Sequence, residues 1–278
     1  MRYFKIQLSL LFRRTSFIAT FTLMCVYAIA AFFLNCINNF GKDVFAVPAA
    51  KYLFLGSNIS NVMFYFIPLI FAVVAAIPFA DTFFEERSRR TTEFCLVRCT
   101  DNQYYFSKLF AVFFSGFIVM FIPLIINYFL NFIAFPIEST VDYTNLPTSE
   151  SGIYTTGIDT LVLFKEFFAK NMYIYNILHL FLISLTSGFI SVVVFQFSFF
   201  YKKSRVMLIC SFFIIYHIYT IILTAFGARE FCINNYIFAS MVFEGQTTRG
   251  LFVVFIVLVL AAFLPIPFAK RKLRKIYD

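Results

Sequence analysis

Six long apolar runs alternate with short polar segments along the chain. The runs cover approximately residues 17–36, 60–80, 109–135, 173–200, 206–226 and 251–269. A transmembrane helix needs about 20 predominantly apolar residues, and each run supplies roughly that length. No Asp, Glu, Lys or Arg lies in the middle of a run. The pattern therefore predicts an all-α polytopic membrane protein with six transmembrane helices.

Composition supports the same fold class. Hydrophobic residues make up 61% of the 278 positions, and the mean hydropathy is +0.84. Soluble domains contain only about 45–50% apolar residues. The polar segments are too short to hold a second domain, so we expect residues 1–278 to form a single transmembrane domain.

The basic residues gather in four of the polar segments. The N-terminus, residues 81–108, residues 201–205 and the C-terminus together hold 17 of the 23 Lys and Arg residues. Cytoplasmic segments of membrane proteins retain positive charge. The distribution predicts a multi-pass protein of the cell (plasma) membrane with both termini in the cytoplasm. It also accounts for the net charge of +9, and we expect no nucleic-acid partner.

Residues 1–16 have the pattern of an amphipathic helix. The polar residues on one helical face are Arg2, Lys5, Ser9, Arg13 and Ser16. Basic amphipathic helices lie in the membrane interface. We therefore predict an N-terminal interfacial helix, with a charged leader that merely precedes the first span as the alternative.

Two loops and a re-entrant segment complete the predicted fold. Residues 37–59 and 136–172 are predicted as loops, and the second contains a short amphipathic helix capped by Asp159. Residues 227–250 are too apolar for an ordinary loop. We predict that they re-enter the membrane as two half-helices before the last span, where surrounding protein shields the backbone.

Polar and small residues share helical faces within several spans. Small residues at this spacing permit close helix packing, and polar residues inside a membrane are candidates for a functional role. We predict a translocation path along these faces, with hydrogen-bonded packing as the alternative. The predicted path residues are Asn127, Asn131, Ser187, Ser191, His217 and Thr220.

The chain lacks the common nucleotide-binding and catalytic patterns. Neither G-x-x-x-x-G-K-[ST] nor G-x-G-x-x-G is present. We therefore predict that the chain is not an enzyme and has no catalytic residue, cofactor or metal site. Any energy for movement has to come from a separate subunit or an ion gradient.

The six cysteines do not suggest a metal site. Cys95 and Cys99 are four residues apart and have no histidine nearby, which argues against zinc. Cys36 and Cys232 both fall on the predicted outer side, so the sequence leaves open whether they form a disulfide. The remaining cysteines are interpreted as small apolar packing residues.

The most strongly charged segment joins the second and third runs. Residues 81–108 hold ten of the chain's Asp, Glu, Lys and Arg residues. Within the segment, residues 91–98 predict a short amphipathic helix whose apolar part includes Phe94 and Leu96. A short helix with a charged rim is suited to docking in a partner's groove. The alternative is a solvated loop that only sets topology.

This segment resembles a motif of ABC transporter permease subunits of the type 2 export family. That family joins its second and third spans by E-R-E-x-G-T-x-x-x-L-L-x-x-P-x-x-R-x-x-x-x-x-K. In register, the matching residues are Glu86, Arg87, Thr91, Leu96 and Lys108. The motif's second Glu, Gly, first Leu, Pro and Arg are replaced by Ser88, Arg90, Cys95, Cys99 and Asn102. The six-span layout with an interfacial helix and a re-entrant segment also resembles that family.

The resemblance implies the transmembrane subunit of an ATP-driven exporter. The segment would then be a cytoplasmic coupling helix seated in a separate ABC ATPase subunit, and cargo would cross between this chain and a second permease, identical or related. The implied ATPase contacts are Glu86, Arg87, Arg90, Thr91, Phe94, Leu96 and Arg98. Phe-rich spans with few charges favour an amphipathic or hydrophobic cargo, such as a peptide, lipid or drug, and antimicrobial peptide efflux fits this class.

Two other functions stay open on the sequence. A membrane assembly or sensor protein would also dock a cytoplasmic partner, but would move no cargo. A CAAX-type intramembrane protease would use E-E-x-x-x-R and F-x-x-x-H, which occur at residues 85–90 and 213–217. The later histidine motif of that family is missing, because no histidine follows His217.

Overall fold

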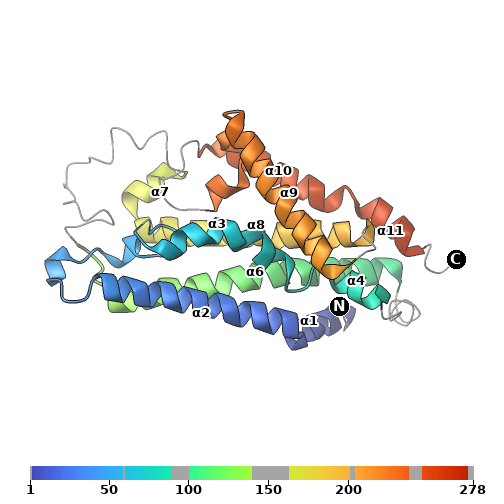
Figure 1. Ribbon diagram of the computed structural model, residues 1–278, viewed down its shortest axis with the longest axis horizontal. Coiled ribbons are helices and arrows are strands. Elements are labelled where there is room, and N and C mark those ends of the chain that lie inside the picture. The colour runs from blue at the N-terminus through green and yellow to red at the C-terminus, as the bar shows by residue number, and fades with distance from the viewer. Residues whose placement is uncertain are drawn as a thin grey trace.

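The described part of the chain is helical and contains no strand. The computed structural model describes residues 2–58, 60–88, 100–139, 163–200, 204–237 and 246–274. Several of the long helices lie along one long axis, and the first and last described helices lie near the same end (Figure 1). The longer α-helices are α2 (Thr15–Asn38), α3 (Val62–Ala76), α6 (Asp101–Ala134), α8 (Met172–Phe200), α9 (Arg205–Ala225) and α10 (Thr248–Phe263). The shorter ones are α1 (Arg2–Arg13), α4 (Thr82–Ser88), α7 (Lys165–Lys170) and α11 (Ile266–Arg274).

Five helical stretches within the described residues are long and apolar enough to cross a membrane. They are Thr15–Asn38, Asp101–Ala134, Met172–Phe200, Val206–Ala225 and Thr248–Lys272. The chain is therefore a multi-pass membrane protein. The predicted second span is shorter than expected, because α3 has 15 residues and a length of about 22 Å, against about 30 Å of hydrocarbon. The count of six spans stays a prediction.

Two helix boundaries differ from those predicted, for local reasons. The third span was predicted from residue 109, but α6 begins at Asp101, because Thr100 and Gln103 form a capping box at its N-terminus. The last span was predicted as one run over 251–269. It is divided at Pro265 into α10 and α11, which are separated by a short turn. Proline has no backbone N–H and breaks the continuous ladder of helical hydrogen bonds.

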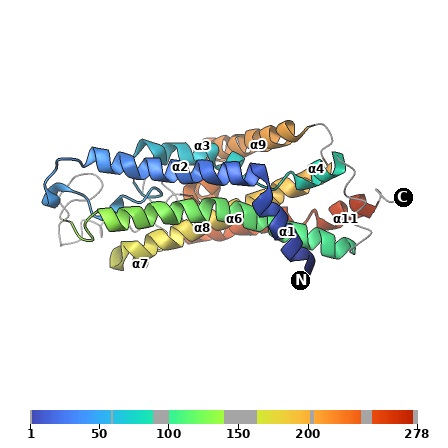
Figure 2. The same ribbon diagram turned by 90° about the horizontal axis from the view of Figure 1, so that it is seen from below.

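The centre of the bundle is the contact between α6 and α8, with α2 beside α6 (Figure 2). Two glycines permit the close approach. A Cβ on Gly116 would lie 2.0 Å from Ser191 Oγ, and one on Gly188 would lie 2.8 Å from the Phe113 ring. Both distances are too short for real contacts, so only glycine fits at these positions. The predicted stripe of small residues on α8 thus packs against a neighbouring helix.

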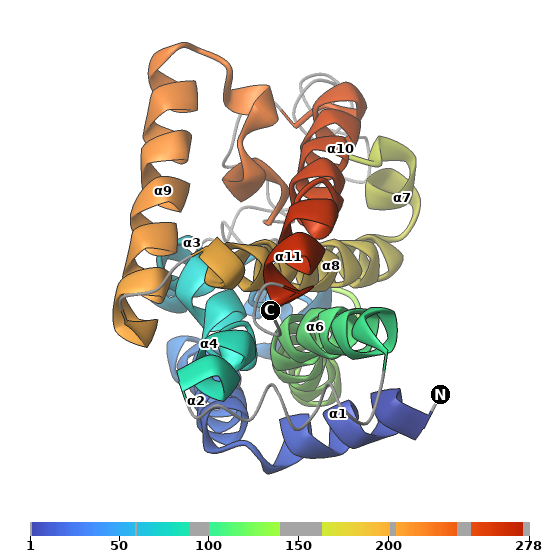
Figure 3. The ribbon, with the colours of Figure 1, turned by 90° about the vertical axis from the view of Figure 1, so that its right-hand side faces the viewer.

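The predicted amphipathic N-terminal helix is present as α1. It turns away from the direction of α2 and lies across the end of the bundle (Figures 2 and 3). Gln7 and Leu11 are buried, whereas Lys5, Ser9 and Arg13 are exposed. Helix α1 also contacts α6. Its exposed polar face and crosswise direction suit a membrane interface, and that location stays a prediction.

The predicted loop over residues 37–59 is largely buried in its second half, which the sequence did not indicate. Residues 49–58 include the short 3₁₀ turn η2 (Ala50–Tyr52), and nearly all of their side chains are inaccessible. The Ala50 N–H donates to the Pro136 carbonyl over 2.9 Å, and the Asn176 side chain donates to the Lys51 carbonyl over 2.7 Å. This stretch, the buried loop, therefore packs into one end of the bundle.

The segments around the other two predicted loops are only partly described. Within 227–250, residues 227–237 contain the 3₁₀ turns η4 (Arg229–Phe231) and η5 (Ile233–Tyr236) and no α-helical turn. The remainder of the predicted half-helices, residues 238–245, lies outside the described residues. Helix α7 begins at Lys165 with Phe164 as its N-cap residue, and the predicted cap Asp159 also lies outside them.

Candidate functional site

Five charged residues meet at the end of the bundle that carries both termini. Arg14 lies between α1 and α2, Asp81 precedes α4, Glu85 and Glu86 belong to α4, and Lys108 lies in the second turn of α6. Figure 3 looks directly at this end and shows α4, α6 and α1 together. We call these five residues the charged cluster.

Arg14 joins the N-terminal helices to α4. Its Nη2 atom lies 3.0 Å from Asp81 Oδ1 and 2.6 Å from Glu85 Oε2. The guanidinium also lies over the Phe79 ring, 5.5 Å from its centroid. Asp81 is fully buried and Arg14 is only 12% exposed. Charges this far from water are stable only when paired, so this contact fixes α4 against the α1–α2 junction.

Lys108 joins α4 to α6 in the same way. It is completely buried and forms an ion pair with Glu86, whose side chain is 20% exposed. The Lys108 ammonium also donates to the Tyr104 hydroxyl over 2.9 Å, and that hydroxyl donates to Glu86. Tyr104 and Lys108 are four residues apart on α6, so they share one face of the helix. The three side chains form a closed set of charge-assisted contacts.

The charged cluster joins the helices on either side of the predicted coupling segment. Helix α4 ends at Ser88, two residues after Glu86, and α6 begins after its Thr100 cap, so residues 89–99 connect the two helices that the Glu86–Lys108 pair joins. Glu86 faces inward to Lys108, whereas Arg87 is partly exposed. The other predicted ATPase contacts lie outside the described residues; they are Arg90, Thr91, Phe94, Leu96 and Arg98. Their role, and that of Glu86 and Arg87, stays a prediction.

The predicted path residues Asn127 and Asn131 belong to a buried network with three further asparagines. The Asn127 amide oxygen accepts from the Leu55 N–H over 3.0 Å, and its amide nitrogen donates to the Ala28 carbonyl over 2.8 Å. Asn131 donates to the Asn127 carbonyl over 2.8 Å. These contacts hold the buried loop and α2 against α6.

Asn35 is the centre of this network. Its amide nitrogen donates to the Leu53 carbonyl over 2.8 Å and to Asn131 Oδ1 over 3.0 Å. Its amide oxygen accepts from Asn58 over 2.9 Å and from Asn61 over 2.8 Å. The asparagine cluster consists of Asn35, Asn58, Asn61, Asn127 and Asn131, all nearly inaccessible.

The other predicted path residues lie on two further helices: Ser187 and Ser191 on α8, and His217 and Thr220 on α9. Ser187 donates to the Gly116 carbonyl over 2.8 Å, and Ser191 donates to the Ala75 carbonyl over 2.6 Å, so both join α8 to neighbouring helices. On α9, Thr220 donates to the Tyr216 carbonyl over 3.0 Å. The half-buried His217 ring packs against Phe213 with ring centroids 4.4 Å apart. Hydrogen bonds do not connect the three sets within the described residues, and the path itself stays a prediction.

Sequence reasoning missed two members of the charged cluster, Arg14 and Asp81, and three of the asparagine cluster, Asn35, Asn58 and Asn61. The only signal for Asn35 was a polar residue near the end of an apolar run, and Arg14 and Asp81 appeared as ordinary flanking charges. On the sequence, His179 falls in the outer turns of the fourth predicted span and is interpreted as meeting the membrane interface. In the fold it is instead fully buried beside Tyr175, with ring centroids 4.6 Å apart. Neither of its ring nitrogens has a hydrogen-bond partner among the described residues.

Two open questions from the sequence concern cysteines and the protease motif. Cys36 and Cys232 are free thiols. Glu85 and Glu86 pair with Arg14 and Lys108 respectively. Among the described residues, no group of three or more His, Cys, Asp or Glu side chains could hold a metal ion.

No protein-family profile, no curated protein and no solved structure matches this chain. The resemblance to ABC permeases therefore rests on the residues and layout of the sequence.

Proposed function

We propose that this chain is the transmembrane subunit of an ATP-driven exporter, and that residues 86–98 dock on a separate ABC ATPase. The supporting observation is the charged cluster, which joins α4, at the beginning of this segment, to α6 and to the junction of α1 and α2. A segment that receives mechanical force has to be fastened to the helices that it moves. Buried ion pairs provide such fastening, because separating either pair leaves a charge without its partner in a site shielded from water.

The contacts suggest how movement would spread from this segment. A displacement of α4 passes through Glu86 and Lys108 to α6, and through Glu85 and Arg14 to α1 and α2. Helix α6 in turn has its largest contact with α8. ATP binding would draw two ATPase subunits together and tilt these helices. Cargo would cross between this chain and a second permease, an identical copy or a related chain.

The proposal includes the membrane and the cargo class. The charge distribution favours the plasma membrane with both termini in the cytoplasm. Apolar spans favour a hydrophobic or amphipathic cargo, such as a peptide, lipid or drug, with antimicrobial peptide efflux as one example. An assembly or sensor protein is the second hypothesis, and the experiment below separates the two.

The first test is purification of the chain from its native membrane in mild detergent, with any ATPase that remains bound. Wild type is compared with the triple variant Arg90→Ala, Phe94→Ala, Arg98→Ala. The matched control is Lys5→Ala, Phe12→Ala, Arg13→Ala, which removes two cations and one phenylalanine from exposed positions of α1 at the same end of the bundle. We expect an ABC ATPase, identified by mass spectrometry, with wild type and control but not with the segment variant.

Two results would contradict the proposal. If wild type retains no ABC ATPase, the exporter hypothesis has no energy source, and the assembly or sensor hypothesis is favoured. If the segment variant retains the ATPase as well as the control does, residues 86–98 are not the docking site. Where the ATPase does bind, cargo-stimulated ATP hydrolysis in vesicles distinguishes an exporter from a static assembly.

A further inference from the structure

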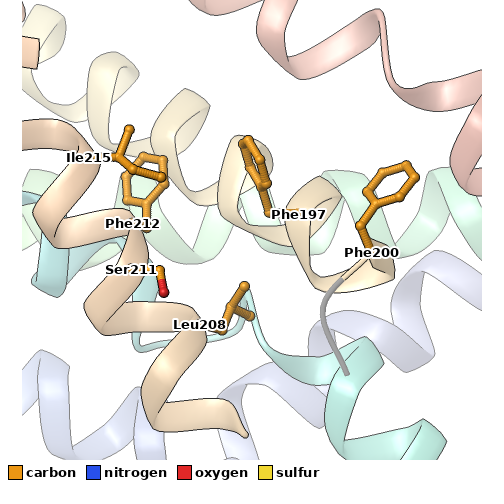
Figure 4. Close-up of a pocket in the computed structure, with 6 residues that line it drawn as sticks. All are labelled: Phe197, Phe200, Leu208, Ser211, Phe212 and Ile215. Atoms are coloured by element: carbon orange, nitrogen blue, oxygen red, sulfur yellow. The ribbon is translucent and has the colours of Figure 1, made fainter. Parts of the chain in front are cut away.

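The two ends of α8 differ in the chemistry of the side chains around them. Near its C-terminus, α8 shares an apolar groove with α9 (Figure 4); the lining residues are Phe197, Phe200, Leu208, Ser211, Phe212 and Ile215. Only Ser211 in this lining is polar, so lipid tails can cover the groove, and they are as apolar as its walls. Near its N-terminus, in contrast, α8 buries polar side chains whose hydrogen bonds are not satisfied.

Three polar side chains in this N-terminal part are completely inaccessible. Tyr175, Asn176 and His179 are each 0% exposed. Among the residues that the structure describes, no hydrogen-bond partner reaches the Tyr175 hydroxyl, the Asn176 Oδ1 atom or either ring nitrogen of His179. A buried polar atom without a partner is costly, because it has lost its hydrogen bonds to water and gained none in return. We call these three residues the polar triplet.

The triplet occupies one sector of the helix surface. Tyr175 precedes His179 by four residues and Asn176 precedes it by three, and both spacings make side chains neighbours on a helix. A helical side chain also leans toward the helix N-terminus, so the His179 ring extends over the turn that carries the other two. The ring centroids of Tyr175 and His179 are 4.6 Å apart. The unsatisfied atoms are therefore placed for a small shared partner.

Neighbouring elements cover the triplet. Helix α7 packs on α8, and the Phe168 ring meets the Tyr175 ring edge to face with centroids 5.1 Å apart. The Asn176 amide nitrogen donates to the Lys51 carbonyl of the buried loop over 2.7 Å, which leaves Oδ1 as the remaining acceptor of that amide. With α8 centred in the bilayer, His179 lies about 10 Å from the midplane, inside the roughly 15 Å half-thickness of the hydrocarbon layer.

The donors and acceptors of the triplet select the class of ligand. A tyrosine hydroxyl both donates and accepts, an amide oxygen only accepts, and a neutral imidazole donates from one nitrogen and accepts at the other. The triplet contains no carboxylate or thiolate to hold a cation, and no cationic side chain to hold an anion. Water both donates and accepts, and a buried water makes about three hydrogen bonds to groups of this kind.

We propose that the polar triplet is a water-binding site within the membrane-spanning part of α8. The four unsatisfied atoms match about one or two ordered water molecules. The bound water bridges Tyr175 and His179, and Asn176 connects it to the buried loop through Lys51. The site needs neither an ATPase nor a cargo, so it is independent of the exporter hypothesis.

The first test is radiolytic labelling of the wild-type chain in detergent. X-ray irradiation converts bound water to hydroxyl radicals, which modify the side chain beside that water even when it is buried, and mass spectrometry identifies the modified residue. Tyr105 is the matched control, because it is also 0% exposed but its hydroxyl donates to Gln196 over 2.6 Å. We expect Tyr175 to be modified several-fold faster than Tyr105.

The second test is the sign of a stability change. Tyr175→Phe removes only the hydroxyl, and the loss of its hydrogen bond to water should lower the apparent melting temperature by about 2 °C. A hydroxyl without a partner would behave in the opposite way, because its removal abolishes a desolvation cost. Tyr105→Phe loses the hydrogen bond to Gln196 and calibrates the scale. Tyr175→Phe combined with His179→Leu should cost less than the sum of the single changes, because both residues share the water.

Three results would overturn the proposal. Labelling of Tyr175 as slow as that of Tyr105 would show that no water lies beside it. A melting temperature of Tyr175→Phe at or above that of wild type would show that the hydroxyl binds nothing. Additive losses in the double variant would show that Tyr175 and His179 do not share a ligand. Because no ATPase is present, none of these results depends on the exporter hypothesis.

Discussion

The ion pair between Glu86 and Lys108 should contribute strongly to stability. Substitution of its two members should lower the free energy of unfolding by unequal amounts. Glu86→Gln removes the carboxylate and leaves the Lys108 ammonium in a site with no exposure. Removing one partner of a buried pair costs about 3–5 kcal/mol. We expect about 3 kcal/mol, because Glu86 is 20% exposed and the Tyr104 hydroxyl still accepts from Lys108.

Lys108→Met should cost less than Glu86→Gln. It removes the buried charge itself, and the partly exposed Glu86 carboxylate can regain water and keeps its hydrogen bond from Tyr104. The expected loss is about 1 kcal/mol, the value of a lost hydrogen bond. In the double variant neither charge remains, so the loss should also be about 1 kcal/mol rather than the sum of the single losses.

The measurement is the fraction of protein that elutes as a single folded species from gel filtration after heating in detergent. For a chain of this size, 1 kcal/mol corresponds to about 2 °C. The apparent melting temperature should fall by about 6 °C for Glu86→Gln and about 2 °C for Lys108→Met and the double variant. Glu166→Gln on α7 is the control, because Glu166 is exposed, and it should leave the apparent melting temperature unchanged. Additive losses in the double variant would refute the coupling of these two charges.

Three further predictions concern the asparagine cluster, the α6–α8 contact and a buried thiol. Asn35→Leu removes the common partner of four buried groups and should lower stability by about 3 kcal/mol, whereas the exposed Asn38→Leu should have little effect. Equal melting temperatures for these two variants would contradict the network. Gly116→Ala places a Cβ 2.0 Å from Ser191 Oγ and should cost about 1–3 kcal/mol, and Gly116→Ala with Ser191→Gly should recover part of that loss. Burial raises the pKa of the Cys232 thiol above its usual value, so less thiolate is present at neutral pH. Maleimide labelling of Cys232 without reductant should therefore be slow and should accelerate with rising pH, and a thiol that labels only after reduction would show a disulfide.

The lengths of the apolar runs are enough to identify most of the long helices. The stretches 173–200 and 206–226 correspond closely to α8 and α9, and 17–36 lies within α2. Such predictions succeed because a membrane helix satisfies its own backbone hydrogen bonds, so its existence depends on local sequence. The polar face of α1 followed from helical periodicity for the same reason.

The pairing of polar side chains depended on tertiary structure. Arg14 and Glu85 are 71 residues apart, and Asn35 and Asn131 are 96 residues apart. The sequence showed that each was a polar residue inside or beside an apolar run, but not which partner would satisfy its hydrogen bonds. The burial of residues 49–58 was missed for a related reason: their backbone and side chains are satisfied by α2, α6 and α8, which lie far away in sequence.

The sequence by itself determined that the chain is helical, crosses the membrane several times and concentrates its charge at a few short segments. Only the tertiary structure decided which of those charges are buried, and that Arg14 and Lys108 both pair with carboxylates at α4, the helix directly before residues 89–99. The physical reason is that apolar burial is non-directional and can be read from local composition. A buried charge or amide needs a specific partner at hydrogen-bond distance, and the packing of distant helices alone supplies it.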